Sequence, residues 1–249
     1  MTEDADVDVD PVEVAVHGAR DDVHVRVVGN VAHVAAQQLL RAVQAGGNIA
    51  LAGGSTPVEA YRLAAAAGAD WSGAHVWFSD ERLVPLDDPR SNAGAANRAL
   101  LDQVSARAIE YVRTDLPAAE AAADYDARIR AVVPAGPDGW PRFDLVLLGL
   151  GPDGHTASLF PGTDAVDERV ACVAHVAVPG LEPVVARVTF TLPLLNAAAR
   201  VSFWVTGAGK ATMVFRAFSG APSAGVPASL VAPTGGRLDL LLDPAAAKG

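Results

Sequence analysis

The chain has 249 residues, of which 51% are hydrophobic and 19% are charged, so it can bury a large core and is neither disordered nor a coiled coil. Its 19 lysines and arginines and 29 aspartates and glutamates give a net charge of −10, which argues against a nucleic acid or an anionic membrane surface as the main partner. A small anion is not excluded, because a few local cations can reverse the sign of the potential inside a cleft.

Two further features restrict the class of protein. Cys172 is the only cysteine, which excludes an internal disulfide framework and a cysteine-built metal cluster and favours a reducing compartment. The first ten residues carry five acidic side chains and no basic one, unlike a secretory signal, and no apolar run reaches the roughly 20 residues of a membrane helix. We therefore expect a cytoplasmic protein with an acidic, frayed tail over residues 1–11 and a single α/β domain over 12–249.

After the tail, β-rich runs alternate with alanine-rich stretches of helical periodicity. In chain order we predict strands at 12–17 and 24–28, a helix at 30–45, a strand at 48–52, a helix at 57–67, a strand at 75–79, a helix at 92–104, a strand at 109–113, a helix at 117–132, strands at 143–149, 171–178, 186–191 and 200–206, a helix at 209–218 and a strand at 237–242. The runs 49–52 and 145–148 are apolar throughout, as in central strands covered on both faces. The pattern predicts a doubly wound α/β fold, in which a mostly parallel sheet has helices on both faces and ligands bind beyond the carboxyl ends of the strands.

The first segment that could carry chemistry follows the strand at 48–52. Gly53 and Gly54 are succeeded by Ser55, Thr56 and Pro57, where proline can begin a helix. Glycines let an anion approach the backbone, and hydroxyls with the N–H groups of a helix N-terminus can then hold a phosphate. A tight turn with an N-cap hydroxyl is the alternative. The segment is neither a Walker A loop nor a nucleophile elbow, because the lysine of the first and the closing glycine of the second are missing.

The second segment places three charged residues, Asp80, Glu81 and Arg82, at the end of the strand at 75–79. Burying such residues without partners is costly, and the planar guanidinium of Arg82 suits a phosphate or a carboxylate. Arg90 and Asn92 follow in a turn-rich stretch and could close over a ligand. The alternative is a solvated loop with a local ion pair.

The third segment, residues 147–162, formally contains the Gly-x-Gly-x-x-Gly fingerprint of dinucleotide-binding folds. That interpretation is discounted, because Pro161 and Gly162 leave no room for the long helix that faces the pyrophosphate. His155 is the informative residue: it follows a glycine-rich turn after a buried strand, where it can face a cleft and move protons near neutral pH. For the other five histidines a structural role is expected.

Two basic residues complete the candidates. Lys210 follows the glycine-rich turn 207–209 after the strand at 200–206, in a chain that has only one other lysine, Lys248. Its ammonium group suits a phosphate or a developing oxyanion, and an exposed lysine at a helix start is the alternative. Arg187 begins an alternating strand and is either a ligand contact from a neighbouring strand or a surface residue.

Together these segments resemble the family of 6-phosphogluconolactonases. The most specific stretch is the Gly-x-Gly-x-Asp-Gly-His-Thr-Ala-Ser-Leu-Phe-Pro run that ends at Pro161. The resemblance extends from about residue 12 to residue 245. The matching stretches occur in the same order as in the family, at residues 52–57, 78–82, 148–161, 187–191 and 207–210. The resemblance implies a fold shared with glucosamine-6-phosphate deaminases and ribose-5-phosphate isomerases. It also implies hydrolysis of 6-phospho-D-glucono-1,5-lactone to 6-phosphogluconate, in the oxidative pentose phosphate pathway and without a required cofactor or metal.

Residue by residue, the resemblance implies that His155 is the base that activates water. A nearby acid would hold its imidazole, and Asp153 is a candidate that the sequence alone does not single out. The family's phosphate site carries over to Ser55, Thr56, Arg82 and Lys210, and less directly to Arg187. The other expected substrate contacts are Gly53, Gly54 and Asp80. The expected partner is therefore a small phosphosugar lactone, and a monomer and a weak homodimer both stay open.

Three other functions compete with this one. A glucosamine-6-phosphate deaminase or isomerase shares the glycine loop and the Asp-Gly-His, but those enzymes follow the histidine with an Asn-Glu-Pro run, whereas here no acid follows until Asp164. A non-catalytic sugar-phosphate sensor would have no need of His155. A nucleotide-dependent oxidoreductase would bind nicotinamide.

Overall fold

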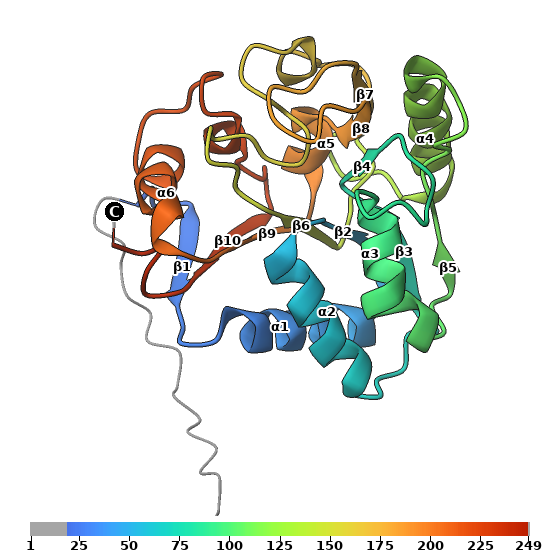
Figure 1. Cartoon of the computed structure of the whole chain (residues 1–249), viewed down its shortest axis with the longest axis horizontal. Coiled ribbons are helices and arrows are strands. Elements are labelled where there is room, and N and C mark those ends of the chain that lie inside the picture. Colours follow the sequence, from blue (N-terminus) through green and yellow to red (C-terminus); the bar gives the residue numbers. More distant parts are fainter. Residues whose placement is uncertain (1–18, 249) are drawn as a thin grey trace, which may run out of the picture.

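The computed structural model describes residues 19–248, so the tail expected at 1–11 and the strand expected at 12–17 lie outside the described residues (Figure 1). Its centre is a sheet of seven parallel strands in the order β1-β10-β9-β6-β2-β3-β5. The strands, in that spatial order, are Val23–Val27, Arg237–Leu242, Arg200–Val205, Leu145–Leu148, Gly47–Leu51, Ala74–Phe78 and Ala108–Ile109. The doubly wound parallel α/β fold expected from the sequence is confirmed.

The chain changes direction across this sheet at β2 and β6. From β2 the chain adds β3 and then β5 toward one edge, and it then returns to β6, from which β9 and β10 extend toward the other edge. β2 and β6 are therefore neighbours although α2, α3 and α4 separate them in the sequence. Ligands of open α/β sheets bind beyond the carboxyl ends of the strands at such a switch point.

Helices cover both faces of the sheet. One face carries α1, α2 and α3, and the opposite face carries α4, α5 and α6 (Figure 1). In chain order these helices are Val31–Ala45, Ser55–Ala66, Asn92–Ala99, Ala118–Val132, Leu192–Ala197 and Ala211–Phe218. No helix within residues 19–248 is long and apolar enough to cross a bilayer.

The alternation of side chains along the central strands feeds two cores. In β2, Ile49 and Leu51 pack toward α1 and α2, whereas Ala50 between them joins the core under α4. The same alternation places Leu147 in the first core and Leu148 in the second. All five residues are buried, which explains why both runs are apolar at every position.

A second, antiparallel sheet lies on the face that carries α4 and α5 (Figure 1). It has three strands, in the order β4-β8-β7, with the bounds Asp80–Arg82, Arg187–Phe190 and Val173–Val176. The sequence indicated no strand at 80–82, where all three side chains are charged, because this strand exists through its pairing with β8. Pairing across this small sheet brings residues 80–82 next to 187–189 at one end of the central sheet.

Candidate active site

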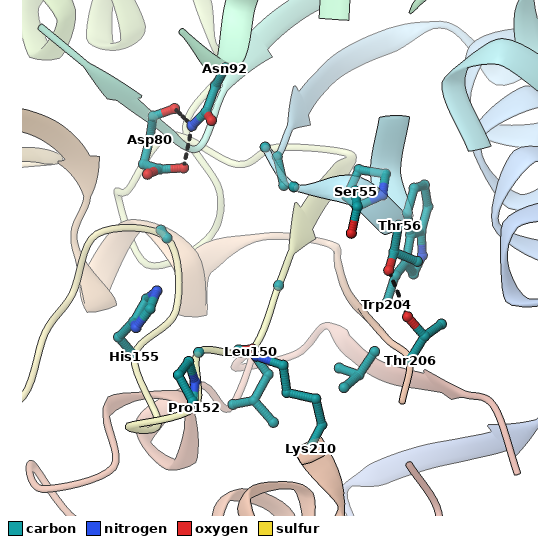
Figure 2. A pocket seen from close by; sticks show the side chains of 18 of the residues that line it. Ser55, Thr56, Asp80, Asn92, Leu150, Pro152, His155, Trp204, Thr206 and Lys210 are labelled. Atoms are coloured by element: carbon teal, nitrogen blue, oxygen red, sulfur yellow. Dashed lines mark hydrogen bonds between the residues drawn. The ribbon is translucent and has the colours of Figure 1, made fainter. Parts of the chain in front are cut away.

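A cavity of about 290 Å³ opens at the switch point, beyond the carboxyl ends of β2, β6 and β9 (Figure 2). The ends of these three strands and the loops after them line it with residues 52–57, 149–152, 155, 157, 204–206 and 210, and the small sheet adds Asp80, Arg82 and Arg187. Its volume lies near the lower end of the roughly 300–1,000 Å³ range of ligand sites, which fits one phosphorylated monosaccharide better than a dinucleotide.

The glycine loop presents the start of α2 to this cavity. Gly54 has φ of 111°, a conformation that favours glycine, and no side chain caps the helix. Ser55 and Thr56 face the cavity from this end, and the Thr56 hydroxyl lies 2.9 Å from that of Thr206 (Figure 2). Tyr61, one and a half turns along α2, fixes the loop by bonding both the N–H and the C=O of Ala52. An uncapped helix N-terminus with two hydroxyls beside it is a site for an anion.

His155 lies on the opposite side of the cavity from the glycine loop (Figure 2). Its Nδ1 lies 2.5 Å from Oδ1 of Asp153, and the same oxygen accepts the His155 backbone N–H at 3.1 Å. Because an ionised carboxylate only accepts hydrogen bonds, Asp153 holds the ring as the tautomer with hydrogen on Nδ1. The remaining nitrogen, Nε2, is then a free base for a proton.

The turn that carries His155 is closed by its own backbone. Gly151 N–H donates to the carbonyl of His155 at 2.8 Å, and the Thr156 hydroxyl donates to the carbonyl of Gly149 at 3.0 Å. The imidazole lies directly against Gly151, where a Cβ atom would overlap its ring. Phe160 packs on the imidazole, with ring centroids 4.4 Å apart. The glycine at 151 is therefore required by the position of the histidine.

The next turn, 156–159, contains an unusual residue. Ala157 has φ of 47°, in the left-handed region, and it is the only residue other than glycine with a positive φ within residues 19–248. This conformation costs a residue with a Cβ atom about 1–2 kcal/mol. Ser158 holds the turn in place: its N–H donates to Thr189 Oγ1 at 3.1 Å and its hydroxyl to Asp80 Oδ2 at 2.6 Å.

Two arginines of the small sheet face each other at the cavity wall. Arg82 of β4 lies opposite Arg187 of β8 in the strand register. Directly opposed like charges destabilise a sheet, and both Nε–H groups are buried without a hydrogen-bond partner in the described part of the chain. Burial also lowers the pKa of Arg187, an effect that the charge of Asp80 partly opposes. An anion between the two side chains would remove both costs.

The third cation is Lys210, from the turn after β9. Its Nζ donates to the carbonyl of Leu150 at 2.8 Å, which points the side chain across the floor of the cavity toward the loop of His155 (Figure 2). Burial lowers the pKa of Lys210, and the nearby charge of Asp153 partly opposes this shift. Because a partly buried ammonium gains by meeting an anion, Lys210 is poised to bind one.

Asp80 is held rigidly between the two halves of the site. Its Oδ1 accepts a hydrogen bond from Asn92 Nδ2 at 3.1 Å (Figure 2). Its Oδ2 accepts a hydrogen bond from the hydroxyl of Ser158. Asn92 itself lies so close to Gly53 that any side chain at position 53 would overlap it. The Asp80 carboxylate thus connects the glycine loop to the turn after His155, and it can accept hydrogen bonds from the hydroxyls of a sugar.

The neighbouring carboxylate, Glu81, points away from the cavity and organises its wall. It is 1% exposed. Its oxygens accept the backbone N–H groups of Asn92 and Ala93 at the start of α3, the N–H of Arg82 and the hydroxyl of Ser91, at 2.7–3.0 Å. Glu81 therefore caps α3 and fixes Arg82 and Asn92, which both line the cavity.

Comparison with known proteins assigns the family. Residues 21–240 match the sequence model for glucosamine-6-phosphate isomerases/6-phosphogluconolactonase. The chain belongs to this family. A 6-phosphogluconolactonase of Nostoc sp. is 41% identical over 204 residues, which are 80% of this chain and 82% of the relative. The solved structure of 6-phosphogluconolactonase from Trypanosoma brucei is 26% identical, with a TM-score of 0.81 over 92% of this chain and 98% of that one.

Coverage is lower for some plant members of the family. A rice protein named probable 6-phosphogluconolactonase 3, chloroplastic, is 43% identical over 158 residues, which are 60% of this chain but 48% of the rice protein. The match thus spans about half the length of that relative.

With the family known, the residues named from the sequence can be located. Gly53, Gly54, Ser55, Thr56, Asp80, Arg82, His155, Arg187 and Lys210 all line the one cavity at the switch point. Asp153 stands behind His155 and bonds it. Of the two residues expected to close over a ligand, Asn92 lines the cavity. Arg90 instead forms an ion pair with Asp88, and its carbonyl oxygen accepts a hydrogen bond from Arg82.

Among the residues that face the cavity but were given no role from the sequence are Ala157, Trp204 and Thr206. Trp204 lies in an apolar strand and therefore reads as core. Its indole N–H is shared between Gln38 Oε1 and Ser202 Oγ, at 3.1 and 3.0 Å, so the ring is fixed from the α1 side. Thr206 follows that strand directly and was foreseeable as a cleft residue from its position at a strand end.

Proposed function

We propose that this chain is a 6-phosphogluconolactonase, a carboxylic ester hydrolase that converts 6-phospho-D-glucono-1,5-lactone to 6-phospho-D-gluconate in the oxidative pentose phosphate pathway. The observation that carries the proposal is the pair formed by His155 and Asp153 at the wall of a cavity that also holds Arg82, Arg187 and Lys210. A lactone with a phosphate needs these two elements, a base for water and positive charge for the anion. The names of the relatives agree with it.

In this proposal His155 is the general base. Asp153 accepts hydrogen from Nδ1, so Nε2 of the imidazole takes a proton from a water molecule at the lactone carbonyl. The water oxygen bonds to the carbonyl carbon, whose oxygen becomes anionic. The ring C–O bond then breaks, and the leaving ring oxygen takes the proton from the imidazolium. The released carboxylic acid loses its own proton to solvent, so the reaction consumes one water and needs no covalent intermediate.

The cations of the cavity hold the phosphate and steady the negative charge. Ser55, Thr56 and the N-terminus of α2 offer donors at one end, and Lys210 crosses the floor. Arg82 and Arg187 add two guanidinium groups with unused N–H donors. A phosphate fixed at a distance from the carbonyl positions the ring, so its contacts contribute to KM and to kcat.

The chemistry of the site disfavours the competing functions. No acid follows His155 until Asp164, so the glutamate that assists ring opening in the deaminases has no counterpart in this loop. The turn 156–159 stands where a dinucleotide-binding fold would need a long helix, directly after the glycine-rich segment 149–154. A sensor that only binds would not need a base with a carboxylate behind it.

The test is a lactonase assay on freshly generated phosphorylated lactone, corrected for spontaneous opening, with H155N as the variant. Wild type should exceed the spontaneous rate, and H155N should lose about 10²–10⁴-fold in kcat, because the base is gone while the ring position is filled by an amide. Circular dichroism controls for folding. Near-normal activity of H155N would refute the base assignment. Ammonia release from glucosamine 6-phosphate would favour the deaminase, and binding without turnover would favour the sensor.

The cellular location stays a prediction. The single cysteine, which is buried, favours a reducing compartment such as the cytoplasm, whereas a rice relative carries the name chloroplastic.

A further inference from the structure

Ala157 occupies a position at which glycine would cost less. The turn 156–159 is closed by a hydrogen bond from Leu159 N–H to the Thr156 carbonyl at 2.9 Å, and Ala157 is its second residue with a positive φ. Turns of this kind take glycine, asparagine or aspartate there. Elsewhere within residues 19–248 this chain follows the rule, with glycine at all nine other positive-φ positions.

The strained conformation is imposed by the surroundings. His155 precedes the turn and is tied to Asp153, and Ser158 inside the turn is tied to Thr189 and to Asp80. These bonds fix both ends of the turn whichever residue stands at 157. The backbone therefore explains the positive φ, but it does not explain the methyl group, which glycine would omit.

Ala157 has two environments. It packs against the core under α4, and it also lines the cavity. Ala157 lies two residues after His155 and one residue before Ser158, whose hydroxyl donates a hydrogen bond to Asp80. The cavity side of Ala157 is therefore at the end where the ring reacts.

We propose that the Ala157 methyl group is a specificity-determining contact that packs against the sugar ring of the bound lactone between His155 and Asp80. The proposal rests on the proposed function and deepens it. A methyl group at this point restricts how the ring can tilt, which holds the carbonyl carbon toward the water activated by His155. The backbone strain of the positive φ at residue 157 is tolerated because the methyl group gains a contact with the sugar ring.

The variant A157G isolates the methyl group, and G68A is its matched control. Gly68 also has a positive φ, is exposed and has open space around its Cβ position, at the end of α2 away from the cavity. A157G should lower kcat/KM about 10-fold, the effect of one methyl contact in a transition state. The loss should be equal for phosphorylated and unphosphorylated lactone, because the contact is to the ring. Its Tm should be unchanged or higher, because glycine adopts this φ freely.

G68A should behave in the opposite way, with a lower Tm and unchanged kcat/KM. The inference is overturned if A157G keeps kcat/KM within twofold of wild type, if its Tm and activity fall together, or if only the phosphorylated lactone is affected. Calorimetric binding of glucose 6-phosphate, which keeps the six-membered ring and the phosphate but has no lactone bond, to wild type and A157G separates the two proposals. If wild type binds this compound but does not hydrolyse the lactone, the proposed function alone is wrong, and equal affinity of both proteins for this compound contradicts the ring contact.

Discussion

Single side chains in this site act through their partners. The orientation of His155 depends on two neighbours. Asp153 bonds its Nδ1, and Gly151 has no side chain that would overlap the imidazole ring. The sequence pointed to His155 because a histidine after a glycine turn at a strand end is placed for chemistry. It could not single out Asp153 from other acids, since the choice depends on how the turn folds back.

Lys210 should make ligand binding depend on pH. Burial lowers its pKa, so at a given alkaline pH a larger fraction of the free protein has lost this ammonium proton than an exposed lysine would lose. A bound phosphate stabilises the ammonium form and raises the pKa again. Binding of 6-phosphogluconate at alkaline pH should therefore take up protons, whereas binding near neutral pH should take up fewer.

Calorimetry in two buffers of different ionisation enthalpy measures this uptake. In K210M the uptake should disappear and the affinity should fall about 10–100-fold, the loss of a charged hydrogen-bond partner. Uptake that persists in K210M would assign the titration to another group.

At the scale of elements, the charged run at 80–82 shows how tertiary structure overrides pattern. Three successive charged residues have no strand periodicity, and they form β4 because β8 pairs with them and Glu81 turns inward to cap α3. The six-residue helix α5, after Thr191, was also not predicted from the sequence. The long strands and helices were predictable, because their apolar spacing alone decides them.

Because Glu81 caps α3 and bonds the backbone of β4, its removal should destabilise the fold. In E81Q the amide nitrogen would face backbone N–H donors, so at least one of them loses its acceptor inside the protein. We expect a loss of about 1–3 kcal/mol in the free energy of unfolding. Urea unfolding measures it, and E59Q, at an exposed position of α2, is the control. An E81Q protein as stable as wild type would show that the carboxylate is dispensable for this junction.

For the whole molecule, the cavity joins the two wings of the sheet. One wing contributes the glycine loop after β2, the other contributes the loops after β6 and β9, and the small sheet adds Asp80, Arg82 and Arg187. The doubly wound fold was predictable from the alternation of strands and helices. The strand order was not, because the return from β5 to β6 leaves no mark in the sequence.

A ligand that bridges both wings should stabilise the entire fold. At about 100 times its Kd, 6-phosphogluconate should add about 2.7 kcal/mol, or roughly 5–10 °C in Tm for a domain of this size. Differential scanning calorimetry measures the shift, and gluconate, which lacks the phosphate, should give a much smaller one at the same concentration. Equal shifts from both compounds would show that the phosphate contributes nothing to binding.

The exposed hairpin at 137–139 lies between α4 and β6, and residues of the cavity lie on both sides of it in the sequence. A nick there would leave Ser55, Asp80 and Arg82 on one fragment and His155, Arg187 and Lys210 on the other. Neither fragment alone would hold all the residues of the proposed site, and β2 would lack β6 beside it. The proposed lactonase activity would then report association of the two fragments, and a nascent chain would lack this activity until the residues after 139 had been synthesised and had packed against the first half.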